Sequence, residues 1–145
     1  MSDIKEFLTN DHKACDEAFA AMEDAVAAKS SDAERLYENF SNDLINHFSM
    51  EEIVLFPMLG QANSAASGTT KAMEMEHEQM RSLLSKMRKA IESMDKESFF
   101  SLSETLMILM QQHNMKEEQL LYALAQQHLG EDADHIIRQM RSVIY

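Results

Sequence analysis

Helix-breaking residues are scarce in this chain, which has one proline and three glycines among its 145 residues. This scarcity favours long helices, because proline removes a backbone donor and glycine weakens a helix interior. Tryptophan is absent, and the one cysteine, Cys15, has no partner for an intrachain disulfide. A lone cysteine fits a reducing compartment, so we expect a cytoplasmic protein.

Basic residues are also few: 13 Lys and Arg face 25 Asp and Glu, for a formal net charge of −12. Such a balance argues against nucleic acid and against anionic membrane surfaces, both of which attract basic faces. Apolar runs such as residues 53–59 are too short to span a bilayer, and the first residues lack the pattern of a secretory signal. We therefore expect no nucleic-acid or membrane partner. The oligomeric state is left open between monomer and dimer.

Apolar residues recur at three- and four-residue steps, which predicts long helices. We expect four of them, followed by a short C-terminal fifth helix, at residues 4–28, 33–59, 70–93, 97–128 and 132–143. Short linkers make neighbouring helices antiparallel, so the predicted fold class is all-α, an up-down-up-down four-helix bundle. The single domain 1–145 would contain two helical hairpins, at about 1–62 and 68–128.

Three features mark the expected ends of these helices. Pro57 should kink or end the second helix, because it cannot donate a backbone hydrogen bond. The small, polar segment 60–68 is predicted to be a loop. Gly130 is expected to end the fourth helix as its C′ residue.

A polar pattern is written twice along the chain. Residues 47–52 read HFSMEE and residues 113–118 read HNMKEE. One earlier histidine in each half extends the pattern to three residues per half. Corresponding residues of the two halves are 65 or 66 positions apart. The six residues are His12, His47, Glu51, His77, His113 and Glu117. All six fall on the apolar stripes of the predicted helices, so burying them requires partners.

Two arrangements would satisfy these buried groups: histidine–glutamate pairs within each helix, or convergence of all six on metal. Facing side chains of bundle helices build metal sites in this way. Four imidazoles and two carboxylates suit two metals better than one, with the carboxylates able to bridge. Mixed nitrogen and oxygen ligation without thiolates fits iron or manganese better than structural zinc.

The segments NDHKACDE, NHFSMEEIVLFP, MEHEQMR and QQHNMKEEQLLYAL resemble the hemerythrin-like, or HHE cation-binding, domain family over nearly the whole chain. The resemblance implies a four-helix bundle with a non-haem di-iron centre, bridged by oxo or hydroxo, that binds oxygen or related molecules. It also implies that the six residues are the metal ligands and that Glu51 and Glu117 bridge the irons. Manganese or zinc could replace iron in a recombinant sample.

One departure from that family concerns a second histidine on the third helix, where this chain has Met73. Glu74 could supply a carboxylate there, although a solvated glutamate is the simpler interpretation. Three further candidates lie near the site. Met73 could line an apolar path to the metals, although filling the core is the simpler interpretation. Cys15 could be a redox-active neighbour of the site or a small buried residue, and Tyr122 could donate a hydrogen bond there. Phe56 occupies the position that matches Tyr122 in the other half.

Three functions are compatible with these observations. The first is a di-iron protein that binds oxygen or a similar diatomic molecule for sensing, storage or redox chemistry, rather than a dedicated enzyme. The second is a di-iron redox enzyme or iron-centre repair protein that acts on peroxide or nitric oxide. The third, a metal-free helical interaction module, leaves the duplicated polar pattern unexplained. Glu52 and Glu118, beside the predicted ligands, are expected to be solvated or to support them, and His128 and His135 to lie on the surface.

Overall fold

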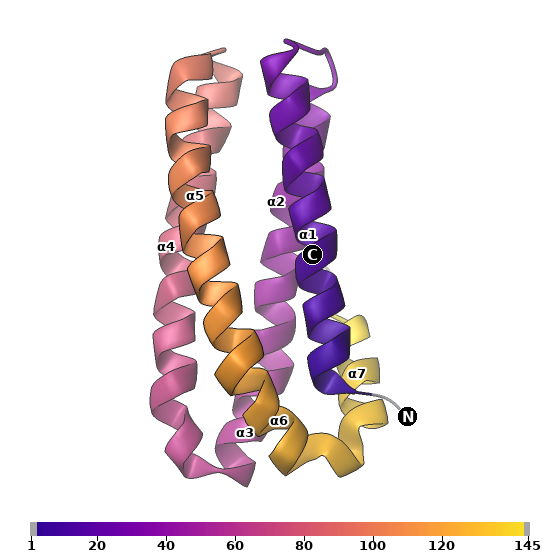
Figure 1. The fold of residues 1–145 in the computed structure, drawn as a ribbon. Helices are drawn as coiled ribbons and strands as arrows, with labels where there is room; N and C mark the ends of the chain where they lie inside the picture. The colour runs from indigo at the N-terminus through magenta and orange to yellow at the C-terminus, as the bar shows by residue number, and fades with distance from the viewer. Residues whose placement is uncertain (1–2, 144–145) are drawn as a thin grey trace.

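The computed structural model describes residues 3–143, which form an antiparallel bundle of four helices (Figure 1). The bundle helices are α1 (Ile4–Ala27), α2 (Ala33–Ser49), α4 (Ser67–Glu92) and α5 (Lys96–Lys116). α1 packs along α2 and α4 packs along α5, so each half of the chain is a helical hairpin. The predicted fold class is confirmed. Within residues 3–143 no helix is both long and apolar enough to cross a membrane.

The two hairpin turns have the same backbone form. Lys29 and Met94 adopt left-handed φ values of 53° and 56°. The next residues, Ser30 and Asp95, donate their N–H groups to carbonyls five positions earlier, which satisfies the last carbonyls of the preceding helix. Asp95 then caps α5 with its side chain, as Asp3 caps α1. The internal repeat therefore extends to the turns.

The second and fourth bundle helices each pass through a π-helical turn before continuing as a short α-helix. These segments are η1 (Met50–Leu55), α3 (Phe56–Ala62), η3 (Glu117–Leu121) and α6 (Tyr122–Leu129). In each turn the N–H group five residues after a buried glutamate donates to its carbonyl, from Phe56 to Glu51 and from Tyr122 to Glu117. A π turn contains one residue more than an α turn and therefore rotates the side chains of the next helical segment about the axis.

This rotation corrects the predicted inner face of the fourth helix. Regular spacing from His113 and Glu117 puts Leu120 and Leu124 on the inner face, yet Leu120 is 52% exposed and Leu124 is only partly buried. Leu121, Tyr122 and Ala125 occupy the interior instead, each at 0% exposure. The three- and four-residue spacing that predicts a face assumes a regular helix, and η3 breaks that regularity by one residue.

The second helix was predicted to kink or end at Pro57, but it does not end there. Helical turns continue to Ala62, and the irregular turn precedes the proline. Pro57 lies in the first turn of α3, where a missing N–H is tolerated.

The predicted loop at 60–68 is largely helical. α3 extends to Ala62, a 3₁₀ turn η2 (Ser64–Ala66) comes next, and α4 already begins at Ser67. Only Asn63 is extended, and its side chain accepts a hydrogen bond from Ala65 N–H. Small residues are compatible with helical turns, and none of the three glycines adopts a positive φ.

The end of the chain also differs from the prediction. Gly130 has a φ of −58° and does not end the helix as a left-handed residue. It begins a 3₁₀ turn, η4 (Gly130–Asp132), which leads into α7 (Ala133–Arg141). Helical turns therefore run unbroken from Lys96 to Arg141, and the expected separate fifth helix over 132–143 is the bent end of this long run. α7 folds back to pack on α1 and η1 (Figure 1).

The apolar core is divided into two clusters by a polar layer. The lower core, between the C-terminal segments and the start of α1, includes Leu8 and Met73. The upper core, towards the hairpin turns, includes Cys15 and Met80. His12 lies in sequence between Leu8 and Cys15, and the other predicted metal ligands occupy the same level of the bundle. The fold thus places a layer of charged and polar groups in the middle of an otherwise apolar interior.

Candidate metal centre

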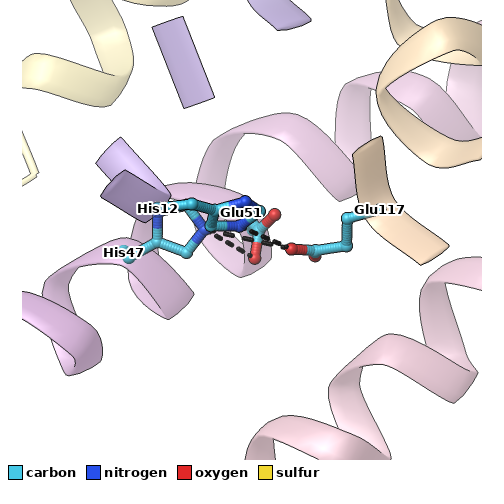
Figure 2. Close-up of side chains that lie close together, drawn as sticks. All are labelled: His12, His47, Glu51 and Glu117. Atoms are coloured by element: carbon cyan, nitrogen blue, oxygen red, sulfur yellow. Dashed lines mark hydrogen bonds and ion pairs between the residues drawn. The ribbon is translucent and has the colours of Figure 1, made fainter. Parts of the chain in front are cut away.

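The six residues of the duplicated pattern meet in this polar layer. Their exposure does not exceed 4%. They form two groups that share Glu51 and Glu117, and within each group the candidate ligand atoms lie within 4.8 Å of one another. We name the group of His12 and His47 the first cluster, and that of His77 and His113 the second cluster. Figure 2 shows the side chains of the first cluster directed toward one another.

Both glutamates reach both clusters. Glu117 Oε1 lies 3.1 Å from His12 Nε2, and Glu117 Oε2 lies 3.2 Å from His113 Nε2. Glu51 Oε1 lies 3.1 Å from His77 Nε2 and 3.5 Å from His47 Nε2, while Glu51 Oε2 accepts a hydrogen bond from Tyr122. The carboxylates therefore have the position that bridging ligands of a binuclear site require.

The Nδ1 atom of each histidine, on the side of the ring away from Nε2, contacts a carboxylate of another helix. We name these four acids the outer carboxylates. Their distances to the histidine Nδ1 atoms are 2.8 Å for Glu118 and His12, 2.6 Å for Asp11 and His47, 2.6 Å for Glu52 and His77, and 2.8 Å for Glu76 and His113. A neutral histidine whose Nδ1 donates to its outer carboxylate presents an unprotonated Nε2 to the interior, as in metal-binding histidines with supporting acids.

Two of the outer carboxylates, Glu52 and Glu118, are the second glutamates of the repeated Glu-Glu pairs. Glu52 and Glu118 were expected to be either solvated or supporting, and the structure places both against histidines. Asp11 and Glu76 were not identified from the sequence. Each directly precedes a histidine of the pattern, and that adjacency is the signal that could have found them. A side chain one position away lies about 100° round the helix, where it reaches the neighbouring helix.

Basic residues support the outer carboxylates of the second cluster. Arg81 donates to Glu52 at 2.8 Å, and Lys116 pairs with Glu76. Within residues 3–143, no lysine or arginine pairs with the outer carboxylates of the first cluster. The acids of the second cluster are thus the more firmly fixed of the two sets.

The buried histidines and glutamates shift one another's pKa values. Burial lowers the pKa of His77, but the carboxylates of Glu51 and Glu52 outweigh burial and raise this pKa to about 9. The pKa of His47 is likewise raised well above its ordinary value, against the effect of burial, by Glu51 and Asp11. Burial raises the pKa of Glu117, yet the surrounding histidines hold it well below its usual range. Six carboxylates around four imidazoles favour positive charge, as protons or as metal ions.

Four buried atoms of the second cluster make no hydrogen bond. They are Glu51 Oε1, His77 Nε2, His113 Nε2 and Glu117 Oε2. Glu51 Oε1 faces His77 Nε2 at 3.1 Å and Glu117 Oε2 faces His113 Nε2 at 3.2 Å, so the atoms contact one another without being aligned as hydrogen bonds. Because all four belong to one group of candidate ligands, a cation between them would satisfy every one. The residues present therefore fit a metal ion on chemical as well as geometric grounds.

In the first cluster, by contrast, the hydroxyl of Tyr122 lies among the candidate ligand atoms. Its hydroxyl donates to Glu51 Oε2 at 2.6 Å and lies 2.9 Å from Glu117 Oε1. Burial and the charges of Glu117 and Glu51 raise the pKa of this phenol well above its ordinary value. The matching residue of the other half, Phe56, stacks beside His77 with ring centroids 6.0 Å apart.

The remaining candidates lie outside both clusters. Met73 is buried in the lower core, and Glu74 is partly exposed. Cys15 is buried in the upper core, and burial raises the pKa of its thiol to about 12, so it is neutral. His128 and His135 are exposed, as expected.

Comparison with known proteins agrees with this geometry. Residues 3–125 match the family described as the Hemerythrin HHE cation binding domain. Searches of curated proteins and of solved structures found no match. The matched region contains all six residues of the two clusters and all four outer carboxylates. The chain therefore belongs to the hemerythrin HHE cation-binding domain family.

Proposed function

We propose that the two clusters bind two iron ions and that the protein uses them to bind oxygen or a related diatomic molecule, for sensing, storage or redox chemistry. Iron would supply the ligand binding and electron transfer that these side chains alone cannot provide. His12 and His47 would hold one ion and His77 and His113 the other, with Glu51 and Glu117 shared.

The observation that supports this proposal best is the set of four buried atoms without hydrogen bonds in the second cluster. In a metal-free interaction module these atoms would have only one another, in contacts of 3.1 and 3.2 Å that are not aligned as hydrogen bonds. The donor set of imidazoles and carboxylates, without thiolate, suits iron.

The protein's own residues would do three things around the ions. The outer carboxylates orient the imidazoles, and the apolar residues above and below the layer exclude water. Tyr122 places its phenol oxygen among the side chains of the first cluster. The lone Cys15 is consistent with a reducing cytoplasmic location.

Metal analysis with optical spectroscopy tests the proposal. The purified protein is loaded with ferrous iron without oxygen, freed of excess metal and then exposed to air. We expect two irons per chain, one for each cluster, and new visible absorption on exposure to air. A correctly folded sample that retains no iron would exclude the proposed function.

A redox enzyme or iron-centre repair protein is the second candidate. The observation in its favour is Met73, which is buried where the resemblance leads us to expect a fifth histidine, so that one ion would have a free position. Catalytic consumption of peroxide or nitric oxide by the iron-loaded protein would favour this candidate. Reversible oxygen binding without consumption would favour a carrier or sensor.

A further inference from the structure

The phenol oxygen of Tyr122 lies close to one nitrogen or oxygen atom from each residue of the first cluster. Its distances are 3.0 Å to His12 Nε2, 3.3 Å to His47 Nε2, 2.6 Å to Glu51 Oε2 and 2.9 Å to Glu117 Oε1. The hydroxyl donates one proton and its oxygen can accept hydrogen bonds from the two histidines, so hydrogen bonds account for at most three of the four contacts at a time. One of the two contacts with carboxylate oxygens therefore requires another reason.

Coordination geometry supplies that reason. Nitrogen and oxygen ligands lie about 2.0–2.2 Å from a transition-metal ion. Two such ligands at a right angle in a square-pyramidal or octahedral site are then about 3 Å apart. The four distances from the Tyr122 oxygen are distributed around this value. The oxygen thus lies where a fifth ligand adjacent to all four others would be.

We infer that Tyr122 is a protein ligand of the metal ion in the first cluster and binds it as a phenolate. This inference rests on the proposed iron site. On binding, the phenol loses its proton to the solvent buffer, as other protein ligands do when they coordinate metal. Iron is neither oxidised nor reduced in this step.

The π turn η3 brings Tyr122 to this position. In a regular α-helix, a residue five positions after Glu117 would lie about 140° further round the axis. The extra residue in η3 places the side chains of Glu117 and Tyr122 on one face instead, and both are fully buried. Phe56 has the same relation to Glu51 through η1, but its ring offers no oxygen. An ion in the second cluster would therefore lack this ligand and would keep a position for an external molecule.

Tyr122→Phe tests the inference without changing the shape of the side chain much. A phenolate bound to ferric iron gives a broad visible charge-transfer band whose excitation enhances tyrosine ring vibrations in resonance Raman spectra. We expect these vibrations in the iron-loaded, oxidised protein and their loss in Tyr122→Phe. Tyr37→Phe is the matched control, because Tyr37 is also buried but donates to the Leu84 carbonyl in the upper core. It should keep the vibrations.

A double variant should restore the tyrosine vibrations that Tyr122→Phe loses. Adding Phe56→Tyr to Tyr122→Phe moves the phenol to the second cluster, and the vibrations should return. Wild-type protein with two irons but no phenolate vibrations would overturn the inference and leave the proposed function intact. Tyrosine vibrations that remain unchanged in Tyr122→Phe would also overturn the inference. Failure of wild-type protein to bind iron at all, measured by metal analysis, would overturn the proposed function itself.

Discussion

The two clusters have the same ligand atoms but different surroundings. Each contains two histidine Nε2 atoms and one oxygen from each of Glu51 and Glu117. In the first cluster these atoms meet the hydroxyl of Tyr122, whereas in the second they face one another without hydrogen bonds. Basic residues support the outer carboxylates of the second cluster alone, and Phe48 stacks on His77 at 4.0 Å.

These differences fall where the internal repeat is not preserved. Phe56 corresponds to Tyr122, and Asp16 corresponds to Arg81. The repeat thus provides a symmetric set of ligands, and substitutions beside it make two unequal sites. The two sites therefore differ in what surrounds them: a phenol oxygen lies in the first cluster, and phenylalanine rings lie beside His77 in the second.

Removing a shared ligand should have the largest effect. Glu117→Ala removes an oxygen from both clusters, so we expect the affinity for both ions to fall more than about 100-fold, beyond the usual effect of losing a supporting group. His77→Ala removes an atom of the second cluster alone and should leave one ion bound. Equilibrium dialysis with metal analysis measures both, with the exposed Glu104→Ala as control. Retention of two ions by Glu117→Ala would contradict the shared geometry.

The pH dependence of stability should differ in sign between the metal-free and the loaded protein. Because His77 has a raised pKa in the folded protein, its proton stabilises the fold below pH 6.5, and this contribution disappears as the pH rises through about 9. The metal-free protein should lose on the order of 3 kcal/mol from this residue. Metal competes with the same protons, so the loaded protein should gain stability over that range.

Denaturant titration at several pH values, with and without metal, measures this contrast. His77→Gln should reduce the pH dependence of the metal-free protein. If the metal-free protein becomes more stable between pH 6.5 and 9, the assignment of a proton to His77 is wrong.

Outer carboxylates should have a smaller effect, confined to one ion each. Glu118→Gln weakens the support of His12, and Glu52→Gln weakens that of His77. We expect about a 10- to 100-fold loss of affinity at the corresponding ion. Glu78→Gln is the control, since Glu78 contacts Arg81 but no histidine of the clusters. Equal losses at both ions from a single variant would show that the clusters do not act separately.

The basic residues should matter least. Arg81→Gln removes the cation behind Glu52, but the carboxylate keeps its contact with His77. A partly exposed ion pair contributes about 0–1 kcal/mol, so the affinity at the second ion should change less than about tenfold. Isothermal titration against the wild-type protein measures the change. A larger loss than that of Glu52→Gln would mean that Arg81 acts on more than its carboxylate.

The sequence predicts the bundle and the six inward residues well because both depend on regular helical spacing. His47 and Glu51 are four residues apart on one apolar face, and no distant contact is needed to see it. The π turns could not be predicted in this way, because hydrogen bonds between i and i+5 depend on how the whole helix packs. Regular spacing therefore puts Leu120 in the interior, and it predicts Tyr122 only as a hydrogen-bond donor near the site, not as a residue inside the first cluster.

The outer carboxylates were partly hidden for a different reason. Asp11 and Glu76 look like ordinary surface acids in a chain with 25 of them. Their role depends on which helix lies beside them, and that is a property of the tertiary fold. The segment 60–68 was taken for a loop from its composition alone, although alanine and serine also form helical turns.

The polar layer between the two apolar clusters has a consequence for how the protein unfolds. Packing between Leu8 and Cys15 is interrupted at His12, and the same break crosses all four helices. Without ions, the two ends of the bundle have little apolar surface in common and can open separately, so amide hydrogen exchange should divide the molecule into an upper and a lower unit. Ions that join all four helices at this level would merge the two units into one cooperative transition.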